Sequence, residues 1–131
     1  MSHVKANELG QLQIQLLKLL WKRGNGTVHD LLADWPTPDR PAYVTILTVL
    51  RRLEKRGLLA HDTRERSFVY RPLVSEQELQ SDLLGDLVQR VFGSPSTLVS
   101  RLLDEEHMPV SELERIRQAV EAKALRSRGA E

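Results

Sequence analysis

The chain has 131 residues and no cysteine, and its formal net charge is +1 at pH 7. This length suits one ordinary domain or a small domain with an appendage, and the lack of cysteine excludes disulfides and thiolate metal sites. No apolar run approaches the roughly 18 residues that a membrane span needs, and residues 1–8 do not read as a signal peptide. We therefore expect a soluble, cytoplasmic protein without direct membrane insertion.

The small net charge conceals a basic part and an acidic part of the chain. Residues 1–72 hold 12 Lys and Arg against 7 Asp and Glu, whereas residues 73–131 hold 7 against 11. The basic excess is concentrated in residues 40–72, which carry 8 basic and 3 acidic side chains. A basic lobe favours a polyanionic partner, and the alternative is random variation of surface charge.

The first third of the chain predicts two helices. Leucines recur at helical spacing over residues 9–23, and Gly24 is a typical helix stop. Residues 27–28 are long enough only for a very short strand. A second, short helix is expected over residues 29–35, ended by the prolines that follow.

A third helix is expected over residues 41–56. Pro41 suits the first helical turn, where its missing N–H would be unpaired in any case, and Gly57 follows as a stop. Ile46, Leu50 and Leu53 fall on one side of this helix, as a core face should.

Two strands are expected next, at residues 58–62 and 67–72, with residues 63–66 as the turn between them. Arg64 and Arg66 place positive charge at the tip of this hairpin. Three helices followed by a hairpin with a basic tip is the element order of a winged helix-turn-helix. The predicted fold class is therefore mainly α, with an N-terminal winged-helix DNA-binding domain at residues 1–73.

Residues 74–131 are predicted to form a helical dimerisation domain. Capping boxes at Ser75 and Ser111 and a proline at Pro95 mark the starts of three helices, which reach residues 92, 106 and about 125 before the chain frays. Three short amphipathic helices bury too little surface to be stable alone, and an identical chain is the simplest partner. The residues expected at the interface are Leu79, Leu83, Leu87, Val91, Leu98, Leu102, Leu113, Ile116 and Val120.

The face of the third helix opposite its core side has the chemistry for reading DNA. Threonine can hydrogen-bond a base edge or touch thymine's methyl group, and arginine can bridge guanine or grip phosphate. The early part of a recognition helix enters the major groove, so the threonines are expected at bases and the later cations at phosphates. The candidate DNA-binding residues are Thr45, Thr48, Arg51, Arg52 and Lys55 on the helix, with Val49 beside them, and Arg64 and Arg66 on the wing at residues 62–67.

Other interpretations stay open at this point. The polar face could be an ordinary solvated surface, or a winged-helix module could bind an acidic protein without specific DNA binding. No catalytic grouping, phosphate-binding loop or metal-ligand spacing is present, so neither an enzyme nor a cofactor or metal site is expected. A small ligand is a further alternative, with Trp21 and Trp35 as pocket walls, although core packing is the simpler interpretation of both.

Several stretches of the chain resemble a known family. The run YVTILTVLRRLEKRGLLAH, followed by SFVYRPLVS, is similar to the penicillinase and methicillin-resistance repressors, a family that includes copper-responsive repressors. The opening LQIQLLKLLWKRGNGTVHDL is similar as well, and the resemblance extends over roughly residues 9–125. It implies a dimeric winged-helix transcriptional repressor that binds a palindromic double-stranded operator upstream of resistance or transport genes.

The resemblance also implies a signalling partner. Members of the family are induced through a membrane-bound zinc metallopeptidase sensor that leads to cleavage of the repressor in its dimerisation region, usually between Asn and Phe within a helix. The matching position here holds Arg101 and Leu102, so cleavage by the familiar route does not follow from the residues present. The copper-responsive branch carries a C-terminal cysteine pair motif, which this chain lacks.

On the third helix the match to the family is close but incomplete. Thr45, Thr48 and Arg52 match polar positions of the family. Val44 stands where many members have a polar or basic residue, so the resemblance implies no base contact for it.

Overall fold

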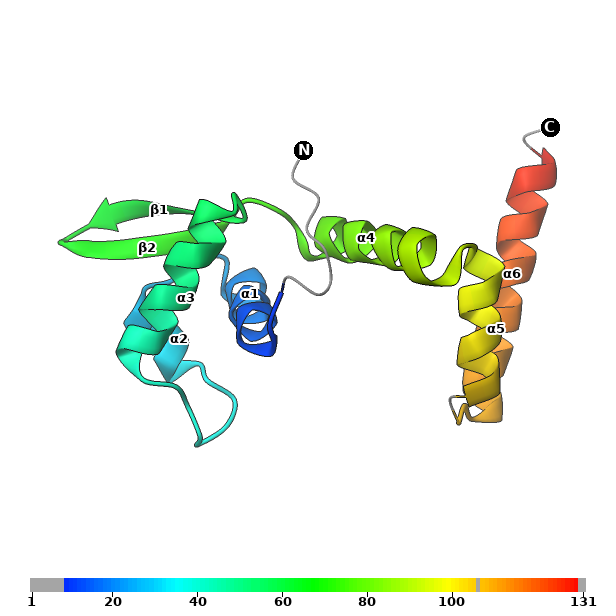
Figure 1. The fold of residues 1–131 in the computed structure, drawn as a ribbon, viewed down its shortest axis with the longest axis horizontal. Helices are drawn as coiled ribbons and strands as arrows, with labels where there is room; N and C mark the ends of the chain where they lie inside the picture. The colour runs from blue at the N-terminus through cyan, green and yellow to red at the C-terminus, as the bar shows by residue number, and fades with distance from the viewer. Residues whose placement is uncertain (1–8, 106, 130–131) are drawn as a thin grey trace. The chain divides into compact units, whose positions relative to one another are not determined.

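The structure is a computed structural model that describes residues 9–105 and 107–129 (Figure 1). In chain order its elements are α1 (Gln11–Arg23), α2 (Val28–Ala33), α3 (Tyr43–Lys55), β1 (Leu59–Arg64), β2 (Ser67–Pro72), α4 (Glu76–Leu87), a π-helical turn (Val88–Phe92), α5 (Pro95–Glu105) and α6 (Val110–Gly129). The chain divides into two compact units, the first of which ends at Val91. The predicted fold class, mainly α with a winged helix-turn-helix, is confirmed.

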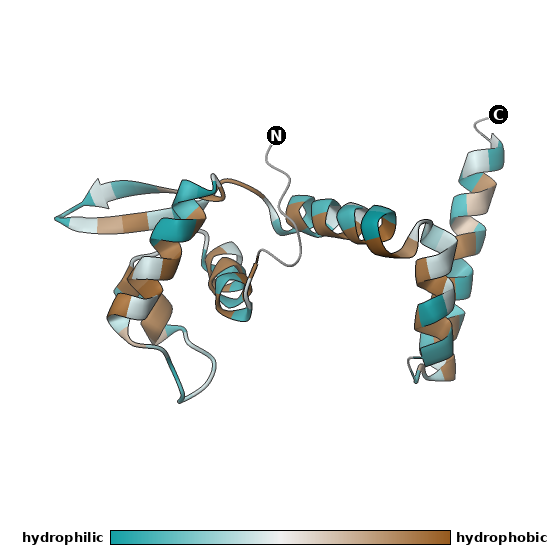
Figure 2. Ribbon diagram, in the orientation of Figure 1, coloured by the Kyte–Doolittle hydropathy of each residue, from teal (hydrophilic) through white to brown (hydrophobic). Residues whose placement is uncertain are grey.

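The first unit is built around the apolar sides of α1, α2 and α3. Leu16, Leu20, Leu31 and Leu50 are fully buried in it, and burying one such side chain stabilises a fold by about 1.5–3 kcal/mol. In Figure 2 apolar and polar residues alternate along these helices, as amphipathic elements require. Apart from Tyr70, no side chain of the described residues with a polar or charged group is buried, so apolar packing holds this core together.

The chain around Thr27 differs from the sequence prediction. The short strand expected at residues 27–28 is wrong, because Thr27 is the N-cap of α2: its hydroxyl accepts a hydrogen bond from the Asp30 N–H at 3.1 Å. In return the Thr27 N–H donates to the Asp30 carboxylate at 2.9 Å and lowers the pKa of that carboxyl group. This contribution to stability is therefore present at neutral pH and is lost in acid, when the carboxylate is protonated.

Helix α3 starts two residues later and ends one residue earlier than predicted, and Gly57 follows it as the predicted stop. Ala42 is the N-cap, so Pro41 lies before the helix and not in its first turn. At the other end Gly57 has a φ of 83°, which is accessible at little cost only to glycine. The Gly57 N–H donates to the Glu54 carbonyl at 2.9 Å and the Leu58 N–H to the Leu53 carbonyl at 3.0 Å, the two hydrogen bonds of a Schellman motif.

The wing is a longer hairpin with a tighter turn than predicted. Thr63 pairs with Phe68 and Arg64 with Ser67, so the four-residue turn expected at residues 63–66 is wrong. Only Glu65 and Arg66 remain at the tip, with φ of 48° and 70°. Positive φ at both central residues is the geometry of a type I′ turn, whose twist matches that of the flanking strands.

A backbone bridge attaches the wing to the helices. The Gly26 N–H donates to the Tyr70 carbonyl at 2.9 Å, and the Tyr70 N–H donates to the Gly26 carbonyl at 2.8 Å. The Tyr70 side chain is buried in the helical core. Burial raises the pKa of its hydroxyl, and the negative charge of Glu54 adds to this effect.

Two hydrogen bonds fix the start of α4. The Ser75 hydroxyl accepts from the Glu78 N–H at 3.0 Å, which confirms the predicted helix start. The Trp21 indole N–H donates to the Val74 carbonyl at 2.9 Å. The segment between the wing and α4 is therefore tied directly to α1.

The first turns of α4 belong to the winged-helix unit. Leu79 is 5% exposed within its core, and Leu83 packs against the same cluster. The prediction of Leu79 as a dimer contact is therefore wrong, because its side chain is used inside its own unit. For the same reason the compact unit extends to Val91, whereas the sequence placed the boundary after residue 73.

The second unit contains α5 and α6. Helix α5 begins at Pro95 as predicted; its predicted end at residue 106 lies outside the described residues. Both helices are amphipathic (Figure 2), and they expose a set of large apolar side chains: Val99, Leu102, Leu103, Val110, Leu113, Val120 and Leu125. Within the described part of the chain, no helix has the length and apolar character to cross a membrane.

Helix α6 differs from its prediction at both ends. It begins at Val110, so the capping box expected at Ser111 is wrong. Pro109 precedes the helix, and its carbonyl accepts the first backbone hydrogen bonds of α6, from the N–H groups of Glu112 and Leu113 at 3.0 and 3.2 Å. The helix continues to Gly129, and the predicted fraying over the last residues before it is not observed.

Two variants of α4 test whether this helix belongs to the first unit. Leu79→Ala should lower the free energy of unfolding by about 2–5 kcal/mol, because it leaves a cavity in the core. Leu84→Ala on the same helix removes a side chain that is 53% exposed and should cost less than about 1 kcal/mol. Urea unfolding followed by circular dichroism measures both. Equal destabilisation by the two variants would contradict the packing of Leu79.

Candidate nucleic-acid interface

Helix α3 buries one side completely. Ile46, Leu50 and Leu53 lie in the core, as predicted. Val49, which the sequence placed on the polar side, is also buried at 9% exposure. The core side of the helix is therefore wider than predicted, and the face that remains for a partner is narrower.

The outer face of α3 carries short threonine side chains near its start and cations near its end. Thr45, Thr48, Arg51, Arg52 and Lys55 are all exposed, as predicted. Within the described residues none of the three cations is paired with a carboxylate. Their charge is therefore available to an anionic partner.

The Thr48 hydroxyl has an intrahelical partner. It donates to the Val44 carbonyl, four residues earlier, at 2.9 Å. This bond is common for threonine within helices. It leaves Thr48 with its methyl group and its acceptor lone pairs for an external contact.

The wing adds cations beside this helix. Arg64 ends β1 and Arg66 occupies the tip, and both are exposed. Arg71, further along β2, is paired with a carboxylate: its Nε lies 3.5 Å from Oδ2 of Asp62 on the neighbouring strand. Arg64 and Arg66 are therefore the wing cations best placed to meet a phosphate backbone.

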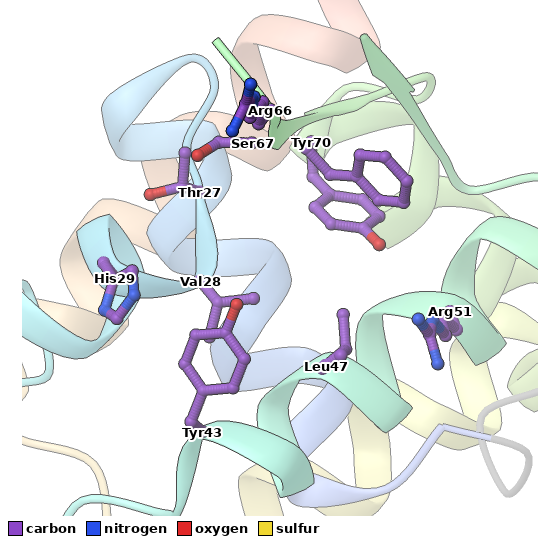
Figure 3. Close-up of a pocket in the computed structure, with 10 residues that line it drawn as sticks. Thr27, Val28, His29, Tyr43, Leu47, Arg51, Arg66, Ser67 and Tyr70 are labelled. Atoms are coloured by element: carbon purple, nitrogen blue, oxygen red, sulfur yellow. The ribbon is translucent and has the colours of Figure 1, made fainter. Parts of the chain in front are cut away.

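A groove of about 260 Å³ lies between α3, the start of α2 and the wing (Figure 3). Figure 3 shows Tyr43, Leu47 and Arg51 along α3, with Arg66 and Ser67 on the wing side. The residues that line the groove are Thr27, Val28, His29, Tyr43, Leu47, Arg51, Arg66, Ser67, Phe68 and Tyr70. None of them is acidic, so the groove combines aromatic walls with two arginines.

The wing is held against α3 by a polar and aromatic contact. Nδ1 of His61, on β1, lies 2.8 and 2.9 Å from the carboxylate oxygens of Glu54, on α3. Because an ionised carboxylate only accepts, Nδ1 carries the proton. The His61 ring also stacks on Phe68 with 4.2 Å between centroids and lies 5.6 Å from the Tyr70 ring. This contact fixes the wing relative to the outer face of α3.

Comparison with known proteins places the chain in a family. The sequence model of the penicillinase repressor family matches residues 9–122. The chain belongs to this family. Its members include the penicillinase repressor of Bacillus licheniformis, which is 23% identical over 118 residues, covering 89% of this chain and 92% of the relative.

Two further relatives have been described. The transcriptional regulator BlaI of Mycobacterium tuberculosis is 27% identical over 117 residues, covering 88% of this chain and 85% of the relative. The DNA-binding domain of the repressor BlaI, known from a solution structure, has 27% sequence identity to this chain. The two structures align over 54% of this chain and 87% of that domain, with a TM-score of 0.48.

The structure brings together some of the predicted residues and adds others. Arg51 and Arg66, from different elements, line one groove. Tyr43 and Phe68, which the sequence did not indicate as site residues, are walls of this groove. Tyr43, Leu47 and Arg51 follow one another at intervals of four, so helical spacing could have shown this stripe.

Other predicted residues lie apart from this surface. Trp21 and Trp35 both pack against the core, as expected, and Trp35 also lines a hollow of about 470 Å³ whose lining does not include Trp21. The two tryptophans therefore do not form one pocket. The position predicted from the resemblance to match a cleavage site, Arg101 and Leu102, is exposed in the middle of α5, and Nη2 of Arg101 lies 3.1 Å from Oε1 of Glu105.

The contact between His61 and Glu54 generates a testable prediction. In His61→Ala, the amides of β1 and β2 should exchange with solvent about five- to thirtyfold faster, because an aromatic pair and a partly buried hydrogen bond to a carboxylate are together worth about 1–2 kcal/mol. Hydrogen exchange followed by NMR measures this. Asp62→Asn is the control: it removes the pair with Arg71, whose members are about half exposed, and should change exchange little. Unchanged protection in His61→Ala would show that the wing does not depend on this contact.

Proposed function

We propose that this chain is a dimeric transcriptional repressor that binds a palindromic operator through α3 and the wing. The observation that carries the proposal is the exposed threonine and arginine face of α3 beside a cationic wing. Membership of the penicillinase repressor family and the relatives described as a repressor and a transcriptional regulator support it. The alternative, a protein–protein interaction module, has no comparable support.

In the proposed complex α3 enters the major groove. Its first residues, Thr45 and Thr48, face base edges, and its last ones, Arg52 and Lys55, face phosphates, because a recognition helix enters the groove with its N-terminal part. The wing then lies over the neighbouring backbone or minor groove. The groove between α3 and the wing, with Arg51 and Arg66 in its lining, suits the phosphodiester strand that separates the two grooves of DNA.

Electrostatics should dominate the affinity. Five cations of each subunit belong to the proposed surface: Arg51, Arg52, Lys55, Arg64 and Arg66. Each phosphate that they neutralise releases a counterion, so log affinity should fall by roughly 0.9 per phosphate for each unit of log salt. A flat salt dependence would favour the protein–protein module instead.

The second part of the proposal is a homodimer formed through the C-terminal helices. The predicted interface residues that remain are Leu83, Leu87, Val91, Leu98, Leu102, Leu113, Ile116 and Val120. Several of them are well exposed in the single chain, and apolar patches of this kind mark association surfaces. Two-fold symmetry of the protein would match the two half-sites of a palindrome.

The zinc metallopeptidase sensor that the resemblance implies is the proposed signalling partner.

The dimer is tested by charged substitutions in the second unit. The double variant Leu102→Lys and Leu113→Lys should be largely monomeric in sedimentation velocity at micromolar concentration, because it places two cations in the proposed apolar interface. Val110→Lys is the control, since Val110 is 81% exposed and lies outside the predicted set. Dimerisation of the double variant at parental strength would place the interface elsewhere.

Base readout and phosphate binding are separated by two substitutions. Thr45→Ala removes no charge, so it should cost about 1–3 kcal/mol on the cognate site and leave binding to random DNA nearly unchanged. Arg64→Ala should weaken both kinds of DNA together and reduce the salt slope by about one. Fluorescence anisotropy with both duplexes at two salt concentrations measures all of these values. Equal losses on cognate and random DNA for Thr45→Ala would show that this face does not read bases.

A further inference from the structure

The first turn of α3 exposes an apolar side chain on the face proposed to meet DNA. Val44 is 70% exposed, whereas Leu73, another exposed aliphatic side chain of the winged helix, is 49% exposed. Val44 belongs neither to the apolar core of the first unit nor to the side chains that pack against that core. Valine is also a mediocre helix former, so neither packing nor helix propensity accounts for it at this position.

Thr48 adds a second apolar group next to Val44. The two residues are four apart, and side chains at this spacing are neighbours on a helix surface. Because the Thr48 hydroxyl donates to the Val44 carbonyl at 2.9 Å, its proton is not available to a base. The methyl group of Thr48 and the two methyl groups of Val44 therefore add a small apolar patch to the start of this face, beside Thr45.

We propose that Val44 and Thr48 form an apolar patch that reads the 5-methyl groups of thymines in the major groove. The thymine 5-methyl is the only methyl group on the major-groove edges of the four standard bases, and alkyl side chains recognise it by contact. The inference rests on the proposed function and deepens it, since it assigns Val44 a role in specificity and names the chemical group it contacts.

The geometry limits where the thymines lie. Residues four apart are separated by about 6 Å along a helix, and stacked bases along one strand by about 3.4 Å. The two thymines are therefore expected one or two base steps apart within each half-site. Two-fold symmetry repeats the pattern in the other half-site.

The experiment uses deoxyuridine, which differs from thymidine only by the missing 5-methyl group. The full-length protein first selects its preferred duplex from a random library, and each thymine of a half-site is then replaced by uracil in turn. We expect one or two positions at which affinity falls about three- to fivefold, as contact with one methyl-sized group is worth about 0.8 kcal/mol. Thymines outside the patch should show no such loss.

Variants connect the effect to the two side chains. Val44→Ala removes the methyl groups of Val44, and Thr48→Ser removes the Thr48 methyl while keeping the hydroxyl that bonds to the Val44 carbonyl. Each should lose about three- to fivefold on the thymine duplex and become insensitive to uracil at its own position, since both changes remove the same contact. Leu73→Ala, another exposed apolar residue outside α3, is the control and should keep the full uracil effect.

The outcomes separate this inference from the proposed function. Selection of a specific duplex without sensitivity to uracil at any position would overturn the methyl readout and leave the repressor proposal intact. Uracil effects that persist at full size in both variants would also overturn it. Failure to select any sequence would instead contradict the proposed function itself.

Discussion

The placement of Tyr70 is the constraint on which the DNA-facing surface depends. Its side chain is buried in the helical core, and its backbone pairs with Gly26 in the turn between α1 and α2. A two-stranded hairpin alone is only marginally stable in water, so the wing needs such an attachment. Through one residue, the wing, the α1–α2 turn and the core of α3 become parts of the same packed body.

The functional face of α3 follows from this packing. With Ile46, Leu50 and Leu53 buried, the helix can turn only its threonine and arginine side outward. The ring of His61 and the carboxylate of Glu54 then hold the hairpin beside that side. The two cationic elements consequently share one preorganised surface, and less ordering is required of them when DNA binds.

Hydrophobic periodicity was sufficient for the element order and for the outward face of α3 except Val49, which is buried. The sequence did not predict features that depend on contacts between residues far apart in the chain. Leu79 fits the apolar stripe of α4 equally well as a dimer contact or as a core residue, and only its packing in the first unit distinguishes them.

Local geometry limited the sequence prediction elsewhere. Thr27 caps a helix although β-branched residues favour strands, and Glu65 and Arg66 form a type I′ turn without the usual Asn-Gly signal. The groove was missed because it joins α3 to the wing, and no spacing within one element shows which second element lies opposite.

The turn at the wing tip has a consequence for how such proteins can be evolved or engineered. Glu65 and Arg66 adopt positive φ, a conformation that costs non-glycine residues about 1 kcal/mol or more each. Selection for thermostability alone would favour Asn and Gly at these positions, and would thereby remove a cation from the surface proposed to hold DNA. A stabilised variant library would therefore lose affinity for nucleic acid first at this turn, where stability and activity make opposite demands on the same two residues.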